Sequence, residues 1–134
     1  MSILPSSRFL RNVLLADAAS CIGSGAVQLL FTGSLVPLSG LPAPLLAGTG
    51  WFLLAYAAAV VLIAMRDPLP RALVWLLVIG NAGWAVASIA LLASGLVAPT
   101  ALGTAWVLAQ AVTVGVLAKL QRTGLRRQPA IGLA

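Results

Sequence analysis

Asp17 is an acidic side chain inside a long apolar stretch of this 134-residue chain. An unpaired charge in the hydrocarbon of a membrane is costly, so an acid in such a stretch is by default a candidate functional group. On a helix, the residues three, four, seven and eleven positions later share its face, and these are Ser20, Cys21, Ser24 and Gln28. The stretch therefore carries a polar stripe that we expect to point inward.

The depth of Asp17 decides between three roles. Along a helix it lies about 9 Å from Arg11 and about 14 Å from Arg8. A shallow acid is hydrated from the membrane edge and stabilises the start of its helix. A deeper one either forms a structural hydrogen bond with Asn81 or another polar side chain, or serves in transport or binding. In that last role it is a protonated acid or a carboxylate that meets water or a bound cation.

Other polar and aromatic side chains recur at helical spacing. Asn81, Trp84 and Ser88 share one face, while Trp106, Gln110 and Thr113 share another. Such residues commonly tie membrane helices together, and as a group they predict a polar core. Trp84, near mid-membrane, either fills that core or forms one wall of a small pocket. The candidate ligand-binding or proton-binding residues are Asp17, Ser24, Tyr56, Asn81, Trp84 and Gln110.

The elements that position these residues are four apolar runs. Hydrophobic residues make up 61% of the chain and charged residues 7%, which excludes an ordinary soluble domain. The runs cover residues 13–36, 45–65, 72–97 and 100–118, each near the roughly 20 residues that a membrane-spanning helix needs. We expect one all-α integral membrane domain over residues 1–134, a bundle of four transmembrane helices, with residues 119–134 as a short basic tail.

The cations predict how the chain crosses the membrane. They precede the first run, flank the connection between the second and third, and follow the fourth. The positive-inside rule then places both termini on the cytoplasmic side of a bacterial-type inner membrane. The cations of the tail are candidate contacts for lipid head groups: Lys119, Arg122, Arg126 and Arg127. Cations spread over several membrane edges argue against a nucleic-acid partner.

Two similarities within the chain predict an internal duplication. Residues 48–53 align with 103–108, and residues 17–26 align less closely with 81–90. Chance similarity between Ala-rich helices is the alternative. A true duplication gives two parallel hairpin repeats related by a pseudo-two-fold axis along the membrane normal, with Asp17 opposite Asn81. Small residues at four-residue spacing predict close helix packing or a homodimer contact, and include Gly23, Gly25, Gly83 and Ala87.

The residue inventory narrows the chemistry. The chain has no His and one Cys, which argues against a metal site, and we expect no cofactor. Acid–base catalysis would rest on Asp17 and Tyr56 alone, so we expect a protein that is not an enzyme. The size, the four-helix layout and one acid in the first helix resemble the small multidrug resistance transporters. The acid is Asp17 here and Glu in that family, and no surrounding motif aligns, so the resemblance assigns no residue.

Two functions remain open. The first is a small transporter, or a membrane protein that binds a small molecule or an ion with the buried Asp17. The second is a non-catalytic accessory or structural subunit that packs against a larger membrane complex. Bulky replacements such as Gly23→Leu should disturb an accessory subunit, whereas Asp17→Asn should disable a transporter that still assembles.

Overall fold

The computed structural model describes residues 3–66 and 69–127, with side chains from residue 8 to residue 126. These residues form five α-helices and no strand: α1 Ile3–Leu30, α2 Thr32–Ser39, α3 Ala43–Ala64, α4 Arg71–Ser94 and α5 Ala101–Arg127. All but the short α2 are long and apolar enough to cross a membrane. The prediction of an all-helical, multi-pass membrane protein with four long apolar helices is confirmed.

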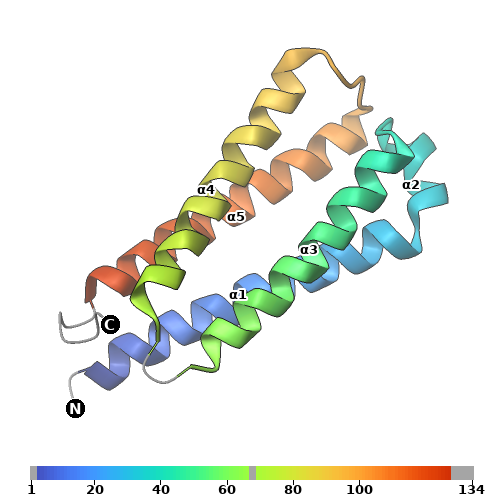
Figure 1. Cartoon of the computed structure of the whole chain (residues 1–134). Helices are drawn as coiled ribbons and strands as arrows, with labels where there is room; N and C mark the ends of the chain where they lie inside the picture. The colour runs from blue at the N-terminus through green and yellow to red at the C-terminus, as the bar shows by residue number, and fades with distance from the viewer. Residues whose placement is uncertain (1–2, 67–68, 128–134) are drawn as a thin grey trace.

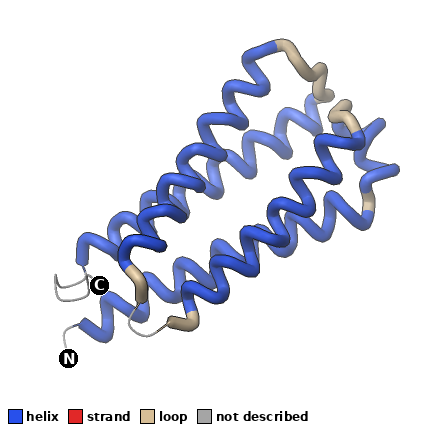
Figure 2. Tube along the Cα trace, viewed as in Figure 1, coloured by secondary structure: helices blue, strands red, loops and turns tan. Residues whose placement is uncertain are grey.

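The long helices run side by side, with α2 at one end (Figure 1). Helix α1 packs along α3, α4 packs along α5, and α1 also contacts α5, whereas α3 and α4 touch at few points. Short connections join the helices at both ends (Figure 2). We call the end where α1 and α4 begin the basic end, because the described cations lie there, and the opposite end, with α2 and residues 95–100, the uncharged end.

The first predicted span, residues 13–36, is not one continuous helix. The chain bends at Phe31, which has φ −118° and separates α1 from α2. The Thr32 hydroxyl donates to the carbonyl oxygens of Gln28 and Leu29, a back-bonding that bends helices. Helix α2 contains Pro37 and ends at Gly40, whose φ of 72° is the left-handed conformation that favours glycine.

Helix α5 continues past the end of the fourth predicted span, so residues 119–127 of the predicted basic tail are helical. The reason is packing on α1. Leu125 is fully buried, and a Cβ on Gly124 would lie 3.0 Å from a methyl group of Leu10. An apolar face therefore holds this part of α5 in place despite its cations. Residues 128–134 of the predicted tail lie outside the described residues.

An arginine closes each helix pair at the basic end. Arg11, early in α1, donates to the carbonyl oxygens of Ala64 at 2.7 Å and Arg66 at 2.9 Å, where α3 ends. Arg71, the first residue of α4, donates to the carbonyl oxygen of Leu125 at 2.8 Å, near the end of α5. The last carbonyl groups of a helix lack partners within the helix and carry a partial negative charge, so both arginines stabilise them.

Backbone contacts join the two pairs at the uncharged end. The Thr100 amide donates to the Ser39 carbonyl oxygen at 2.9 Å, and the Thr100 hydroxyl accepts the Gly103 amide as an N-cap of α5. A Cβ on Gly103 would lie 2.0 Å from the Ser39 oxygen. Only glycine at position 103 allows this approach, so α2 and the start of α5 form a fixed closure.

The main apolar core lies in the half of the molecule nearer the basic end. It is built from all four long helices, and its fully buried members include Leu10, Leu14, Val60, Val74 and Leu125. A smaller cluster around Leu41, Leu46 and Val107 lies near the uncharged end. One group of polar side chains lies within the main core, and a second lies beside the smaller cluster.

Candidate functional site

The first polar cluster surrounds Asp17, which is 0% exposed. Its Oδ2 accepts from Asn81 Nδ2 at 2.9 Å and from Gln121 Nε2 at 2.8 Å, and the Cys21 thiol donates to Oδ1 over 3.6 Å. Asn81 Nδ2 also donates to Gln121 Oε1 at 3.1 Å. One carboxyl group thus joins α1, α4 and α5. We call these four residues the acid cluster.

The acid cluster lies in the half of the spans nearer the basic end. Asn81 is about 15 Å along α4 from Arg71, and Asp17 about 14 Å along α1 from Arg8. On α5, however, Gln121 sits between Lys119 and Arg122, whose exposed side chains are long enough to reach the membrane edge. No described Lys or Arg forms an ion pair with Asp17, so neutral amides and a thiol supply its hydrogen bonds.

The second polar cluster surrounds Gln28, which is 2% exposed. Its Nε2 donates to the Leu46 carbonyl oxygen at 2.9 Å and to the Thr49 hydroxyl at 2.8 Å. Its Oε1 accepts from Trp106 Nε1 at 3.1 Å and from Gln110 Nε2 at 2.9 Å. One amide thus joins α1, α3 and α5 and has a partner in all four bonding directions. We call Gln28, Thr49, Trp106 and Gln110 the amide cluster.

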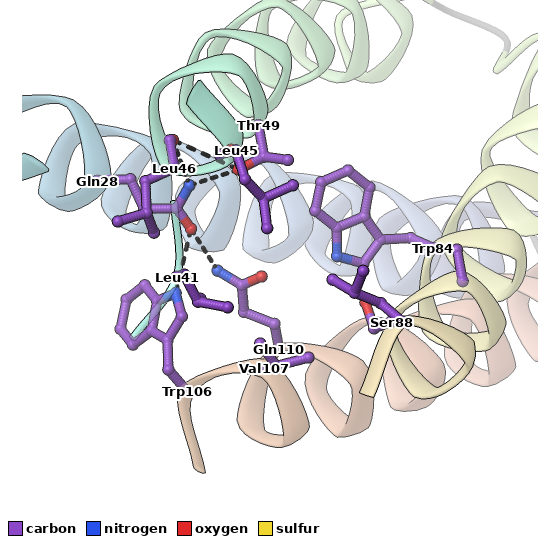
Figure 3. Close-up of a pocket in the computed structure, with 12 residues that line it drawn as sticks. Gln28, Leu41, Leu45, Leu46, Thr49, Trp84, Ser88, Trp106, Val107 and Gln110 are labelled. Atoms are coloured by element: carbon purple, nitrogen blue, oxygen red, sulfur yellow. Dashed lines mark hydrogen bonds between the residues drawn. The ribbon is translucent and has the colours of Figure 1, made fainter. Parts of the chain in front are cut away.

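A cavity of about 270 Å³ adjoins the amide cluster, and we call it the main cavity because both helix pairs line it (Figure 3). A larger and more apolar cavity of about 360 Å³ lies between α2, α3 and α5. Its walls come from both helix pairs, with Gln28 and Thr49 on one side and Trp84 and Ser88 of α4 facing them. Aliphatic side chains fill the rest of the lining, which contains no charged residue. The cavity has room for about nine water molecules at roughly 30 Å³ each.

Three polar groups on the cavity wall have no hydrogen-bond partner among the described residues: the Trp84 indole N–H, the Ser88 hydroxyl and the Gln110 amide oxygen. In Figure 3 the Gln110 nitrogen points toward Gln28, and its oxygen points away from Gln28, toward the side of Trp84 and Ser88. The wall therefore offers two donors and one acceptor to whatever occupies the cavity. This is the pattern of a mostly apolar pocket with a few orienting polar groups.

Aromatic rings bridge the open seam between α3 and α4. Phe52 stacks on Trp84 with ring centroids 5.5 Å apart and on Tyr56 with centroids 6.1 Å apart. The Tyr56 hydroxyl donates to the Leu77 carbonyl oxygen over 3.4 Å. The helix backbones are not closely packed here, so contact between α3 and α4 depends on these aromatic side chains.

The structure divides the six predicted binding residues between the two clusters and the cavities. Asp17 and Asn81 are bonded to each other, whereas Trp84 and Gln110 line the main cavity. Ser24 lines a second cavity of about 110 Å³, and Tyr56 a third of about 60 Å³. Asp17 lines none of these cavities.

The predicted packing residues also differ in their surroundings. Gly25 lies against α3, where a Cβ would be 2.8 Å from the Gly50 carbonyl oxygen. Gly23 and Gly83 have no such neighbour within 4 Å, and Ala87 lines the main cavity. The close approach of α1 and α3 therefore occurs at Gly25 and Gly50.

The predicted lipid contacts lie on the outside of α5. Lys119, Arg122 and Arg126 are exposed, and the side chain of Arg127 lies outside the described residues. Arg71 and Arg11, in contrast, are half-buried and bonded to backbone carbonyl groups.

Sequence reasoning missed Gln121 and the partners of Gln28. Gln121 lies in the predicted tail, between Lys119 and Arg122, yet Val114, Ala118, Gln121 and Leu125 follow one another at helical spacing. That spacing is the signal that identifies it as inward-facing. Searches with this chain match no protein family model, no curated protein and no solved structure.

Proposed function

We propose that this protein is a small transporter that binds an uncharged small molecule in the main cavity and carries it across the membrane. The observation that carries the proposal is the cavity itself: about 270 Å³ between the two helix pairs, with three unpartnered polar groups and no charge on its wall. An ionic ligand would lose its hydration there without a counter-charge, whereas a neutral one gains hydrogen bonds and apolar contact.

In this proposal Asp17 acts on the helices and not on the ligand. Its hydrogen bonds to Asn81 and Gln121 connect α1 with α4 and α5, so they hold one arrangement of the two helix pairs. Breaking them frees the pairs to move relative to each other. The few contacts between α3 and α4 support the seam between these helices as the place where the movement begins.

We further propose that each helix pair is a hairpin repeat in a four-helix bundle with both termini in the cytoplasm. The similar positions of the Arg11 and Arg71 contacts support the repeat. The aligned Trp51 and Trp106 differ, since Trp51 is 66% exposed and Trp106 bonds to Gln28. Failure of the pairs to superpose after a rotation near 180° in an experimental structure would refute the repeat.

The binding proposal is tested by native mass spectrometry of the protein extracted gently from its own membrane. We expect a reproducible small-molecule mass on the wild type. Ala87→Leu fills the main cavity, while Ala90→Leu makes the same change outside its lining. The mass should remain with Ala90→Leu and disappear with Ala87→Leu. No bound mass, or an equal mass on both variants, would refute the proposal.

One observation favours the second function, an accessory subunit. Gly83 lies on a face of α4 with exposed Ile79 and Val86, and it has open space where a Cβ would be. A small residue on an apolar face lets another helix approach closely. A larger protein that co-purifies with the wild type and is lost from Gly83→Leu would support this function over transport.

A further inference from the structure

The cavity of about 360 Å³ between α2, α3 and α5, which we call the apolar cavity, opens on the outside of the molecule. Four of the residues that line it are exposed: Leu38, Leu102, Ala105 and Ala109. Leu46, in contrast, lines it and is 2% exposed. The apolar cavity is therefore a recess with an exposed mouth and a buried inner wall.

The mouth of the apolar cavity faces the hydrocarbon of a membrane. Its α5 residues, Leu102 to Ala109, lie about 2–12 Å along the axis from the first residue of a helix that is apolar enough to cross the bilayer. No Lys or Arg lies at the uncharged end among the described residues. The acyl chains of the leaflet at this end are therefore the material that meets the mouth.

Water is a poor occupant of the apolar cavity, because the polar side chains of its wall are bonded elsewhere. The Ser39 hydroxyl donates to the Leu35 carbonyl oxygen at 2.6 Å and accepts the Leu41 amide at 3.2 Å. The indole N–H of Trp106 donates to Gln28. A buried water needs two or more polar partners, whereas a dry apolar cavity of about 150 Å³ binds benzene. The apolar cavity is suited to hydrocarbon.

The walls of the apolar cavity cannot close on the empty space. Helices α2 and α5 already touch through their backbones, where a Cβ on Gly103 would lie 2.0 Å from the Ser39 oxygen. Gly40, which ends α2, is equally close to the chain before α5, since a Cβ there would lie 2.8 Å from the Ala98 oxygen. A space that cannot collapse leaves its lining without dispersion contacts unless something fills it.

We propose that the apolar cavity binds one acyl chain of a membrane phospholipid, which enters from the leaflet at the uncharged end while its head group stays outside. Scaled from the cavity that binds benzene, the space holds about a dozen carbon atoms, which is a segment of one chain. With no described cation at this end, the chain is recognised and the charge of the head group is not. This site lies outside the main cavity and goes beyond the proposed transport.

The bound chain supports the wall of the main cavity. Leu46 and Trp106 line both cavities, so a chain in the apolar cavity packs against side chains that also face the main cavity. Trp106 is half-buried and bonds to Gln28 through its indole N–H. Contact with the chain restricts rotation of the ring and keeps this bond in place. A lipid thereby becomes part of the surroundings of the amide cluster.

Photolabelling tests whether a chain enters. The full-length protein is reconstituted in phosphatidylcholine with a trace of the same lipid carrying a diazirine in one acyl chain, and adducts are located by mass spectrometry after illumination. Ile79 is 65% exposed and reports ordinary contact with lipid. We expect adducts on buried Leu46 as well as on Ile79. Adducts on Ile79 without Leu46, or adducts on Val107, which lines the main cavity and not the apolar one, would overturn the proposal.

Matched variants and a second lipid sharpen this test. Ala105→Phe puts a ring into the apolar cavity and should lower the ratio of Leu46 to Ile79 adducts at least about fivefold, because the ring takes the space of the chain. Ala55→Phe, at an exposed position outside the lining of the cavities, should leave the ratio unchanged.

The charge of the head group is tested with the same diazirine chain on phosphatidylglycerol. The ratio should stay within about twofold, since no described cation lies at the uncharged end to attract an anionic head. Equal ratios in Ala105→Phe and Ala55→Phe, or a ratio that depends strongly on the head group, would contradict chain binding.

Tryptophan fluorescence gives a measurement that needs no filled cavity. Phosphatidylcholine with brominated acyl chains quenches tryptophans that its chains touch, and the contribution of Trp106 is the emission that Trp106→Phe removes. We expect it to be quenched about as strongly as that of Trp51, which is 66% exposed and is measured with Trp51→Phe. Much weaker quenching of Trp106 would overturn the proposal. None of these assays contains the transported molecule, so their outcome is independent of the search for a ligand in the main cavity.

Discussion

The acid cluster and the amide cluster are built from similar side chains and differ in what adjoins them. In each, one buried residue of α1 receives hydrogen bonds from neighbouring helices. Asp17 is charged when ionised and has no cavity on its own surface, whereas Gln28 is neutral and lines about 270 Å³ of space. The same kind of network therefore holds helices together in one place and shapes a binding wall in the other.

The residue that is most costly to bury is not one of the residues that are free to bind a ligand. Burying an acid is expensive, and this cost alone made Asp17 the most prominent residue of the sequence. The groups free to contact a ligand are instead those of Trp84, Ser88 and Gln110, which are neutral and therefore cost less to bury than an acid. A buried acid therefore points to a group that the fold must keep hydrogen-bonded. Unpartnered polar atoms beside a cavity point instead to a ligand.

The largest loss of stability should follow Asn81→Leu. It removes one amide donor of Asp17 and leaves a buried acid partly unpaired, which typically costs about 3–5 kcal/mol. Unfolding in detergent by titration with a denaturing surfactant measures the change. Asn12→Leu, at an exposed position of α1, is the matched control. Equal stability of the two variants would show that the acid cluster does not hold the helices together.

Gln28→Met should cost less, because every group it releases is neutral. Four hydrogen bonds are lost, and interhelical contacts of this kind average about 0.6 kcal/mol each, so we expect about 2 kcal/mol. The same titration measures it, with Gln110→Met as the control that loses one of the four bonds. A loss as large as that of Asn81→Leu would remove the distinction between the clusters.

Trp106→Phe removes a single hydrogen bond, from the indole to Gln28 Oε1, and keeps an aromatic ring. The expected cost is about 0.6 kcal/mol. Trp51→Phe is the control, because Trp51 is exposed. A small fall in melting temperature relative to Trp51→Phe is expected, and no difference would place Trp106 outside the amide cluster.

Asp17→Asn should change stability least, by less than about 0.5 kcal/mol, because weaker hydrogen bonds are offset by a smaller desolvation cost. The remaining amide oxygen can still accept from Asn81 and Gln121. Transport should nevertheless fall, as measured by uptake of the ligand identified by mass spectrometry, because weaker hydrogen bonds no longer hold the same arrangement of the two helix pairs. A variant that transports normally would limit Asp17 to a structural role.

The positions of the long helices were predictable from the sequence because hydrophobic length alone decides them. The bend at Phe31 was not, since the apolar run continues through it and the cause is a hydroxyl of Thr32. Hydrophobic length did not predict the extension of α5, because cations interrupt the apolar run after residue 118 while one apolar face continues to Leu125. Lys and Arg indicate where a span reaches the membrane edge, but a helix such as α5 can continue beyond them.

Most residues of the candidate site were predictable from the sequence, but which of them contact one another was not. The pairing of Asp17 with Asn81 was one of three roles considered from spacing and depth. That Gln28 would meet Trp106 depends on how α1 and α5 contact each other, a property of the packing that no single helix encodes. Helical spacing assigns residues to faces, and only the packed structure assigns faces to one another.

The arginine contacts at the basic end have a consequence for the order of synthesis. Arg11 can donate its hydrogen bonds to the end of α3 as soon as residue 66 has been made. The first helix pair therefore contains both the donor and the acceptors of these bonds. Asp17 depends on residues made later, and Gln121 follows it by 104 positions. While the ribosome makes the second pair, the acid is therefore in the membrane without its amide donors, with only the Cys21 thiol as its partner.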